Sequence, residues 1–351
     1  MIKIIDKLNK EIKKLKKKNI DNNLKNNLKN NLKKNNTKTG GTINLNDFVS
    51  TKDTECADYL GKQKGEPCSS CNIIDAIVQY TKETIQDQPL YDEQSRLPKQ
   101  IQVAADILHC DTESCIISHP DFKKFVLKNH IVNKHDLEVE LDTKFKTKGP
   151  RDNRNWLSNE DIDENLKQWA LTFLDFFPCP FAMIDFDKTG EPLHKYNLTN
   201  IYNGHHHALT TNGKDRRECK TFACAINTDK HTGSGQHWMA LFVDMRGKSG
   251  EPWTVEFFNS SGSPPAQSIV HWMVKSSECL KQFRASLSNN NGPVDVIYVT
   301  NIQHQKSTSE CGMYTLFYIR SRLEGKSYQL FLSGERISDD VMTEFRKHCF
   351  R

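Results

Sequence analysis

The sequence predicts an α+β protein in which a helical N-terminal arm precedes a mixed α/β core with a central β-sheet. Helical apolar periodicity dominates residues 42–150. From Trp156 onward, strand-like apolar runs alternate with helical segments, a pattern typical of a sheet covered by helices. A polar stretch centred on Gly149 and Pro150 separates the two patterns. With 351 residues, 36% of them hydrophobic, the chain can bury a sizeable core.

The apolar runs also exclude two classes of protein. None approaches the roughly 20 residues of a transmembrane helix, so we expect no membrane span. The start, MIKIIDKLNK, is interrupted by charge and lacks the apolar segment of a signal peptide.

The first 41 residues form a basic, Lys/Asn-rich tail. Residues 1–40 contain 13 lysines and three acidic residues, a net charge of +10, so the remaining 311 residues carry −5 of the total of +5. Such low complexity predicts a disordered, solvated extension. The alternative is a basic segment that binds nucleic acid or an acidic scaffold. The mildly acidic body is a poor general binder of nucleic acid, because that binding requires basic surface.

The elements follow in order. The arm, assigned to residues 42–152, should contain four helices, near 72–86, 99–108, 119–130 and 135–145. The core is assigned to residues 153–351. Ser158 and Asp161 resemble a capping box that opens a helix through Phe177. Strand-like runs occupy 221–226, 238–243, 253–258 and 294–299. Further helices should run from Pro264-Pro265 to about 285, from Cys311 to Leu323 with Gly325 as the stop signal, and from Ser338 to the terminus.

Eleven cysteines are a high number for this chain. Their odd count, without a secretory signal, favours free thiols in a reducing compartment. Cys68-x2-Cys71 and Cys110-x4-Cys115 are the kind of pairs that zinc sites use. The second spacing is irregular and 38 residues separate the pairs, so packing thiols are the preferred interpretation. His205-His206-His207 is interpreted as a loop. We therefore expect no metal and no cofactor.

Cys311 is the first candidate for chemistry. It follows polar Ser-Thr-Ser-Glu, precedes Gly312 and opens an apolar helix. A thiol at a helix N-terminus lies at the positive end of the helix dipole, which favours the nucleophilic thiolate. Taken alone, a buried structural cysteine would explain the residue equally well.

His237 and Asn259 strengthen this candidate. His237 begins one strand-like run and Asn259 closes the next, so antiparallel pairing would place them side by side. A thiol nucleophile needs an imidazole base, and the imidazole needs a polar partner that orients its ring. Gln305, six residues before Cys311, could donate to a developing oxyanion together with the Cys311 N–H.

The order His, Asn about 20 residues later, then Gln-x5-Cys-Gly resembles the adenain and SUMO-specific protease superfamily of cysteine proteases. Longer motifs resemble its African swine fever virus-type, polyprotein-processing members. They are Gly235-Gln-His-Trp-Met-Ala-Leu-Phe-Val-Asp, Phe258-Asn-Ser-Ser-Gly, His304-Gln-Lys-Ser-Thr-Ser-Glu-Cys-Gly, Cys110-Asp-Thr-Glu-Ser-Cys, Trp156-Leu-Ser-Asn and Phe345-Arg-Lys-His. The resemblance covers roughly residues 50–351 and excludes the tail. Asn259 stands where the wider superfamily usually has Asp.

The resemblance implies a helical arm before a sheet-containing core and cleavage after Gly-Gly in viral structural polyproteins. It implies that Cys311 is the nucleophile, His237 the general base and acid, Asn259 the orienter and Gln305 the oxyanion donor. The partners would be polyprotein precursors with Gly-Gly-Xaa sites, met in the host cytoplasm and the virion core.

Three further residues have alternative interpretations. Trp238 would pack over the histidine. Trp156 is either a wall of a narrow Gly-Gly groove or a core residue. Asn227 is a minor candidate for a polar site group, and a turn role is preferred for it.

Other functions remain open at this point. The same Cys-His layout could serve a host-directed SUMO or ubiquitin-like deconjugase, or an acyltransferase. A basic-tailed binding protein with an idle pocket is disfavoured by the complete residue set. Gly40-Gly41, the only Gly-Gly pair in the chain, is interpreted either as a hinge or as a self-processing site whose cleavage would remove the basic tail.

Overall fold

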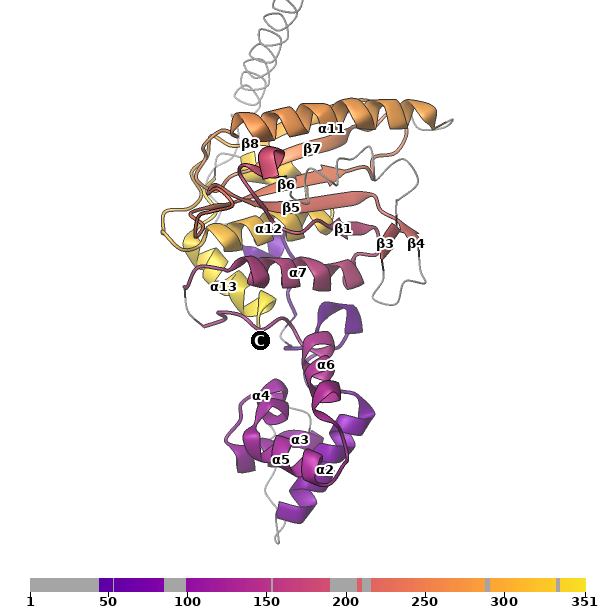
Figure 1. Cartoon of the computed structure of the whole chain (residues 1–351), viewed down its shortest axis with the longest axis vertical. Coiled ribbons are helices and arrows are strands. Elements are labelled where there is room, and N and C mark those ends of the chain that lie inside the picture. Colours follow the sequence, from indigo (N-terminus) through magenta and orange to yellow (C-terminus); the bar gives the residue numbers. More distant parts are fainter. Residues whose placement is uncertain are drawn as a thin grey trace, which may run out of the picture.

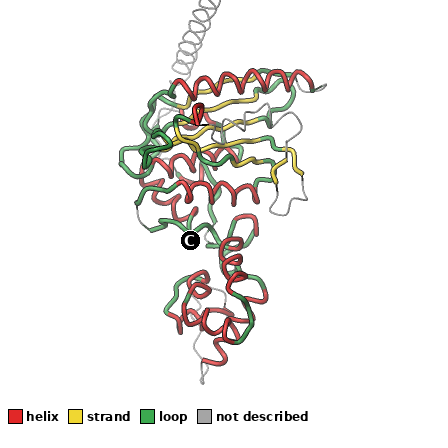
Figure 2. Tube along the Cα trace, in the orientation of Figure 1, coloured by secondary structure: helices red, strands yellow, loops and turns green. Residues whose placement is uncertain are grey.

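The computed structural model describes residues 44–52, 54–84, 99–152, 154–189, 207–209, 216–287, 291–332 and 335–351. These residues form a core and an arm that extends from one side of it (Figure 1). In Figure 2 the strands of the large sheet lie in the core, and the arm consists of helices and loops. The expected α+β class is confirmed. The tail, with Gly40-Gly41, lies outside the described residues.

A mixed sheet of six strands organises the core. Its order is β1-β5-β6-β7-β8, and β2 also pairs with β5. β5, β6 and β7 are antiparallel neighbours, whereas β1 and β2 run parallel to β5, and β8 runs parallel to β7. The four long strands match the four predicted apolar runs. The strands are β1 (Phe176–Pro178), β2 (Ala182–Met183), β5 (Thr221–Asn227), β6 (Trp238–Asp244), β7 (Trp253–Phe258) and β8 (Val294–Val299). β3 (His207–Leu209) and β4 (Arg216–Glu218) form a separate two-stranded sheet.

Helices cover both faces of this sheet. α11 (Gln267–Ser286) lies on one face, and α7 (Asn159–Thr172), α12 (Cys311–Leu323) and α13 (Asp339–Cys349) lie on the other (Figure 1). Alternate residues of β5 therefore enter different hydrophobic clusters, Phe222 with α11 and Ala223 with α12. Burial on both faces explains why β5 is an uninterrupted apolar run in the sequence. The remaining short helices of the described core are α8 (Phe186–Thr189) and η3 (Tyr328–Leu332).

One helix boundary was predicted incorrectly. The Ser158–Asp161 capping box is present, but α7 ends at Thr172 rather than continuing through Phe177. Phe176 and Phe177 instead pair with β5 as the edge strand β1. The exposed edge of β5 offers these aromatic residues backbone partners and burial that a longer helix would not provide.

The arm is a helical cluster with its own hydrophobic centre. The four predicted helices are confirmed as α2, α3, α5 and α6. The short helix α4 was not predicted, because six residues are too few to show a periodicity. The arm helices are α2 (Cys71–Thr84), α3 (Lys99–Leu108), α4 (Glu113–Ser118), α5 (Pro120–Lys128) and α6 (Lys134–Lys144), with the short turn η2 (Asp58–Leu60) at the base.

The segment that leads into the arm packs on the core, although the sequence analysis placed it in the arm. η1 (Leu45–Asp47) and the residues after it enter the main core cluster. The Phe48 ring lies 5.2 Å from that of Phe317 in α12. In addition, Arg320 of α12 binds Asp58, at the base of the arm, at 2.6 Å. The helix that begins at Cys311 therefore contacts both the entry segment and the arm.

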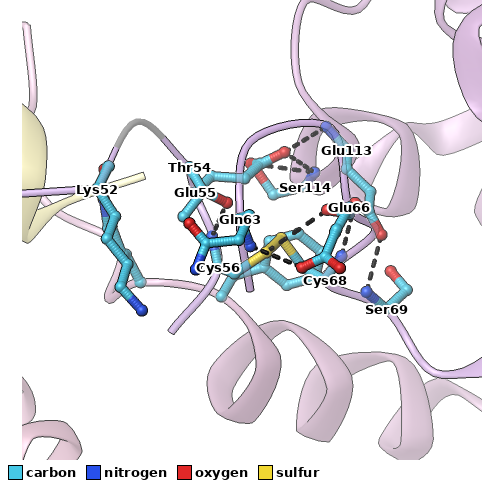
Figure 3. The surroundings of a disulfide bond; sticks show 12 residues. Lys52, Thr54, Glu55, Cys56, Gln63, Glu66, Cys68, Ser69, Glu113 and Ser114 are labelled. Atoms are coloured by element: carbon cyan, nitrogen blue, oxygen red, sulfur yellow. Dashed lines mark hydrogen bonds between the residues drawn. A yellow bond between two sulfur atoms is a disulfide. The ribbon is translucent and has the colours of Figure 1, made fainter. Parts of the chain in front are cut away.

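The expectation that all cysteines are free thiols was wrong. Cys56 and Cys68 form one disulfide (Figure 3), and Cys110 and Cys115 form another. Their Cα separations of 5.0 and 5.6 Å lie in the normal range for such bonds. The reason is tertiary. Glu55 accepts from the Glu113 N–H, and Glu113 accepts from the Cys68 N–H, so the segments on both sides of the disulfide meet at the start of α4, and Cys68 bonds to Cys56 rather than joining Cys71 in a metal site.

Among the helices in the described ranges, none combines the length and the apolarity that crossing a membrane requires.

Candidate active site

Strand pairing brings His237 and Asn259 together. His237 immediately precedes β6 and Asn259 immediately follows β7. The two strands are antiparallel, with Ala240 opposite Phe258, so the start of one strand lies beside the end of the other. His237 Nε2 lies 2.8 Å from Asn259 Oδ1. The predicted adjacency of these two residues is confirmed.

The hydrogen bonds of Asn259 determine which ring nitrogen of His237 carries the proton. Asn259 Oδ1 also accepts from the backbone N–H and the hydroxyl of Ser261, at 3.0 and 2.9 Å, and its Nδ2 donates to the Ser263 carbonyl at 3.1 Å. A backbone N–H can only donate, so the atom that faces His237 is an acceptor oxygen. His237 must therefore carry its proton on Nε2, which leaves Nδ1 with a free lone pair.

Cys311 lies at the first position of α12, as predicted, and is 2% exposed. The backbone N–H groups of Trp238 and Gly312 point at its sulfur, which puts the thiol next to the residue that follows His237. Burial raises the pKa of the Cys311 thiol, and these N–H groups oppose the rise only in part. Burial likewise lowers the pKa of His237, against the hydrogen bond to Asn259. Both shifts favour a neutral thiol and a neutral imidazole, and they act against the helix dipole, which favours the thiolate.

Gly312 is required by the packing of Leu157. A Cβ on Gly312 would lie 2.9 Å from the Leu157 Cβ, closer than side chains pack. Leu157 also accepts a hydrogen bond from Trp238 Nε1 at 3.1 Å. The segment before α7 is therefore fixed directly against the start of α12. Trp156, the preceding residue, is 50% exposed, which rules out the core interpretation and leaves its indole on the surface beside this contact.

Trp238 is 6% exposed and belongs to the main core cluster, with its ring edge-on to Phe181. Asn227 has the turn role that was preferred for it. Its Oδ1 accepts from the N–H groups of Asp229 and Gln236, both at 3.0 Å, and so shapes the loop that leads to His237.

Gln305 is buried on the loop before α12. Its Oε1 accepts from the Ser260 hydroxyl at 2.9 Å, and its Nε2 donates to the Ser307 carbonyl at 2.8 Å. Its backbone N–H donates to the Ser260 carbonyl at 3.1 Å, which ties the loop to the residue after Asn259. An amide nitrogen carries two hydrogens, so a second donor remains on Gln305 after the bond to Ser307.

Sequence reasoning missed the residues that hold this loop. Asp339, the first residue of α13, accepts from the N–H groups of Lys306 and Ser307, both at 3.2 Å, and from the Tyr314 hydroxyl at 3.1 Å. Arg336 binds the same carboxylate at 2.8 Å. A carboxylate in the first turn of a helix looks like an ordinary capping residue in a sequence, so no local signal separates Asp339 from Asp340.

A buried ion pair supports the residue before the nucleophile. Glu310, the N-cap of α12, binds Arg346 of α13 at 2.8 Å, and both side chains are almost completely buried. Arg346 also donates to the Pro150 carbonyl at 3.1 Å, in the linker between arm and core. The pair joins the start of α12, the C-terminal helix and the linker.

Nothing in the described ranges gathers three or more histidine, cysteine or acidic side chains in a geometry that could hold a metal. Of the three consecutive histidines, His205 and His206 lie outside the described residues and His207 begins β3.

Comparison with known proteins identifies the family. The model for the C-terminal catalytic domain of the Ulp1 protease family matches residues 179–351, which include His237, Asn259 and Cys311. A cysteine protease of African swine fever virus (strain Badajoz 1971 Vero-adapted) is 42% identical over 246 residues, which are 70% of this chain and 85% of the relative. The chain belongs to the Ulp1 protease family. It is a cysteine protease, and the predicted resemblance is confirmed.

The similarity to the virus protease extends through the arm of this Ulp1-family chain. A crystal structure of the African swine fever virus protease has a TM-score of 0.70 and 34% identity, and the match covers 86% of this chain and 97% of that one. A further relative, a putative thiol protease of Acanthamoeba polyphaga mimivirus, is 26% identical over 243 residues, 69% of this chain and 70% of the relative.

Proposed function

We propose that this protease cleaves after Gly-Gly in viral structural polyproteins through a Cys311–His237–Asn259 triad. The hydrogen bond between His237 Nε2 and Asn259 Oδ1, at 2.8 Å, is the observation that supports the triad most strongly. It leaves Nδ1 as the base at the start of β6, where Cys311 meets the N–H of Trp238. Trp238 supports the site by packing, and Asn227 acts only through the loop.

In the proposed mechanism, His237 Nδ1 takes the Cys311 proton as the sulfur attacks the scissile carbonyl carbon. The second N–H of the Gln305 amide and the Cys311 backbone N–H receive the oxyanion. The C–N bond then breaks, and His237 returns the proton to the leaving amine. Water, deprotonated by the same imidazole, hydrolyses the thioester and restores the thiol. No cofactor enters these steps.

The Gly-Gly preference is supported by the packing beside Cys311. Leu157 lies against Gly312, and the exposed Trp156 indole precedes it. We propose that Trp156 forms one wall of a groove too narrow for a Cβ next to the scissile bond. The partners would be polyprotein precursors with Gly-Gly-Xaa sites, processed in the viral factory of the host cytoplasm and in the virion core. The similarity to the African swine fever virus protease supports this setting.

A second candidate substrate comes from the name of another relative. A protein of African swine fever virus (isolate Warthog/Namibia/Wart80/1980), 42% identical to this chain, is named a SUMO-1 cysteine protease. Release of a SUMO-like modifier would use the same chemistry on a folded substrate.

Cleavage assays with two substrate classes test the proposal. One is a peptide series with Gly-Gly, Gly-Ala or Ala-Gly before Xaa, and the other is a SUMO fusion protein. We expect cleavage of the Gly-Gly peptides, at least tenfold slower cleavage of the alanine series, and loss of the preference in Trp156→Ala. Efficient release of SUMO without cleavage of the free peptides would instead support the deconjugase.

A further inference from the structure

Two hydrogen bonds hold the two ends of the Gln305 side-chain amide. Its Nε2 donates to the Ser307 carbonyl at 2.8 Å, and its Oε1 accepts from the Ser260 hydroxyl at 2.9 Å. A carbonyl can only accept, so the amide nitrogen must face Ser307, and the amide oxygen then faces Ser260. This orientation leaves the second hydrogen of Nε2 for another acceptor.

The two partners of the amide belong to different parts of the fold. Ser307 lies on the same loop as Gln305, just before α12. Ser260 follows Asn259 after the end of β7, so it belongs to the segment that orients the His237 ring. The bond between Ser260 and Gln305 therefore joins the proposed oxyanion donor to the segment that holds the proposed base.

Both side chains of this bond are removed from water. Ser260 is 1% exposed and Gln305 is 7% exposed. In the described part of the chain, the Ser260 hydroxyl is the one group that donates to Gln305 Oε1. A buried amide oxygen without a donor is unfavourable, so an amide that lost this hydroxyl would turn toward another donor. Such a turn would move the Nε2 hydrogens away from their present position.

The backbone around Ser260 is held without its hydroxyl. The Ser260 carbonyl accepts from the Gln305 N–H at 3.1 Å, and the Asn259 N–H donates to the Val299 carbonyl at 3.3 Å. Asn259 Oδ1 lies 2.8 Å from His237 Nε2. None of these contacts uses the hydroxyl, so its removal should disturb the Gln305 amide and leave the pair of His237 and Asn259 in place.

We infer that Ser260 is a positioning residue for the hydrolysis, an assignment that rests on the oxyanion role proposed for Gln305. The Ser260 hydroxyl acts through Gln305 rather than on the substrate. It holds the amide in the orientation that presents an N–H, and not the amide oxygen, to the developing oxyanion. Because the oxyanion exists only in the transition state, the contribution of Ser260 should appear in kcat and not in KM.

Steady-state kinetics of Ser260→Ala, Gln305→Ala and the double variant on a Gly-Gly peptide test this assignment. We expect Ser260→Ala to lower kcat by about tenfold to hundredfold, the loss typical of a displaced catalytic group, with KM within about twofold of the wild type. In the Gln305→Ala background the same change should have little further effect, because the amide through which Ser260 acts is absent.

Ser277→Ala is the matched control for the loss of a buried hydroxyl. Ser277 is 3% exposed, and its hydroxyl donates to the Val274 carbonyl at 2.8 Å. It lies in α11, on the face of the sheet opposite α12, so the chemical change is the same but distant from the site. Its kcat and KM should match those of the wild type.

Alkylation of Cys311 by iodoacetamide separates positioning of the amide from damage to the triad. This displacement forms no oxyanion, so it depends on His237 and Cys311 but not on Gln305. Mass spectrometry should show that Cys311 is alkylated at the wild-type rate in Ser260→Ala. A clearly slower alkylation would mean that the hydroxyl supports the triad itself, which would overturn the inference.

The kinetic results can also contradict the inference. A wild-type kcat in Ser260→Ala would overturn it, as would losses that multiply in the double variant. If Gln305→Ala keeps the wild-type kcat, the oxyanion role of Gln305 fails; if Gln305→Ala is slow and Ser260→Ala is not, only the role of Ser260 fails. Should Ser260→Ala not fold, Ser260→Cys, whose thiol fills the space but donates weakly, is judged by the same kinetic criteria.

Discussion

Replacing Asp339 by Asn should weaken catalysis although Asp339 is not expected to touch the substrate. One carboxylate oxygen accepts from the N–H groups of Lys306 and Ser307 and from Arg336, at 3.2, 3.2 and 2.8 Å. In Asp339→Asn the amide oxygen can still face these three donors, but the negative charge that strengthens their hydrogen bonds is lost, and an NH2 group replaces the oxygen that faces the Tyr314 and Ser307 hydroxyls. Charge-assisted hydrogen bonds contribute about 1.5–3 kcal/mol each, and partial exposure of Lys306 reduces the sum. We expect a loss of about 3 kcal/mol in the free energy of unfolding.

The kinetic consequence follows from the position of Gln305 on the same loop. A loop displaced by about 1 Å moves the oxyanion donor, and such a misplacement lowers rates by about tenfold to hundredfold. The oxyanion exists only in the transition state, so kcat should fall while KM stays within about twofold.

Asp340→Asn is the matched control for this experiment. The chemical change is identical and one residue away, but the Asp340 side chain is 87% exposed and its partner, Arg154, is 50% exposed. Exposed pairs contribute little, so its unfolding free energy and kcat should stay close to the wild type. Steady-state kinetics on a Gly-Gly peptide and urea unfolding provide the data. Equal kcat values for the two variants would refute the role given to Asp339.

The remaining predictions concern the site, the pH dependence and the tail. Cys311→Ala and His237→Ala should each abolish turnover, and the double variant should be no worse; appreciable turnover by Cys311→Ala would reject the assignment. Gln305→Ala should lower kcat by about 10²–10³ with little change in KM, and an unchanged kcat would remove it from the oxyanion site. Burial lowers the pKa of His304 from 6.5 to about 4, so below pH 6.5 the unfolded chain binds the proton more readily than the folded one. The free energy of unfolding should therefore fall by about 3 kcal/mol between pH 6.5, above which the contribution of neutral His304 is fully present, and pH 4. Urea unfolding of His304→Gln should show no such fall from this residue. Parallel pH profiles for the variant and the wild type would contradict the prediction. Active protein should acquire a Thr42 N-terminus by cleavage after Gly41, and an intact Met1 terminus after long incubation would reject self-processing.

The sequence located the proposed catalytic residues because each stands at the boundary of a strongly patterned element. His237 and Asn259 flank two apolar strands, and Cys311 begins an apolar helix. Their adjacency then follows from antiparallel pairing alone. The family resemblance supplied the proposed catalytic role of each residue, because the patterns that predict strands and helices say nothing about chemistry.

The supporting residues could not be predicted, because their roles depend on contacts between distant segments. Glu310 and Arg346 are 36 residues apart, and Asp339 binds a loop 33 residues earlier in the chain. Nothing in their sequence neighbourhood distinguishes them from exposed charges. The effect of burial on the pKa of Cys311 could not be predicted for the same reason, since burial is a tertiary property that the helix dipole argument does not include.

Covalent labelling with a peptide probe tests the central claim most directly. A Gly-Gly peptide ending in a vinyl ester captures the attacking sulfur as a stable thioether, and mass spectrometry of the digested protein locates the adduct. We predict a single adduct, on Cys311, that is lost in Cys311→Ala and formed much more slowly in His237→Ala. An adduct on any of the six other free cysteines of the described chain, or equal labelling of His237→Ala and wild type, would contradict the proposed triad.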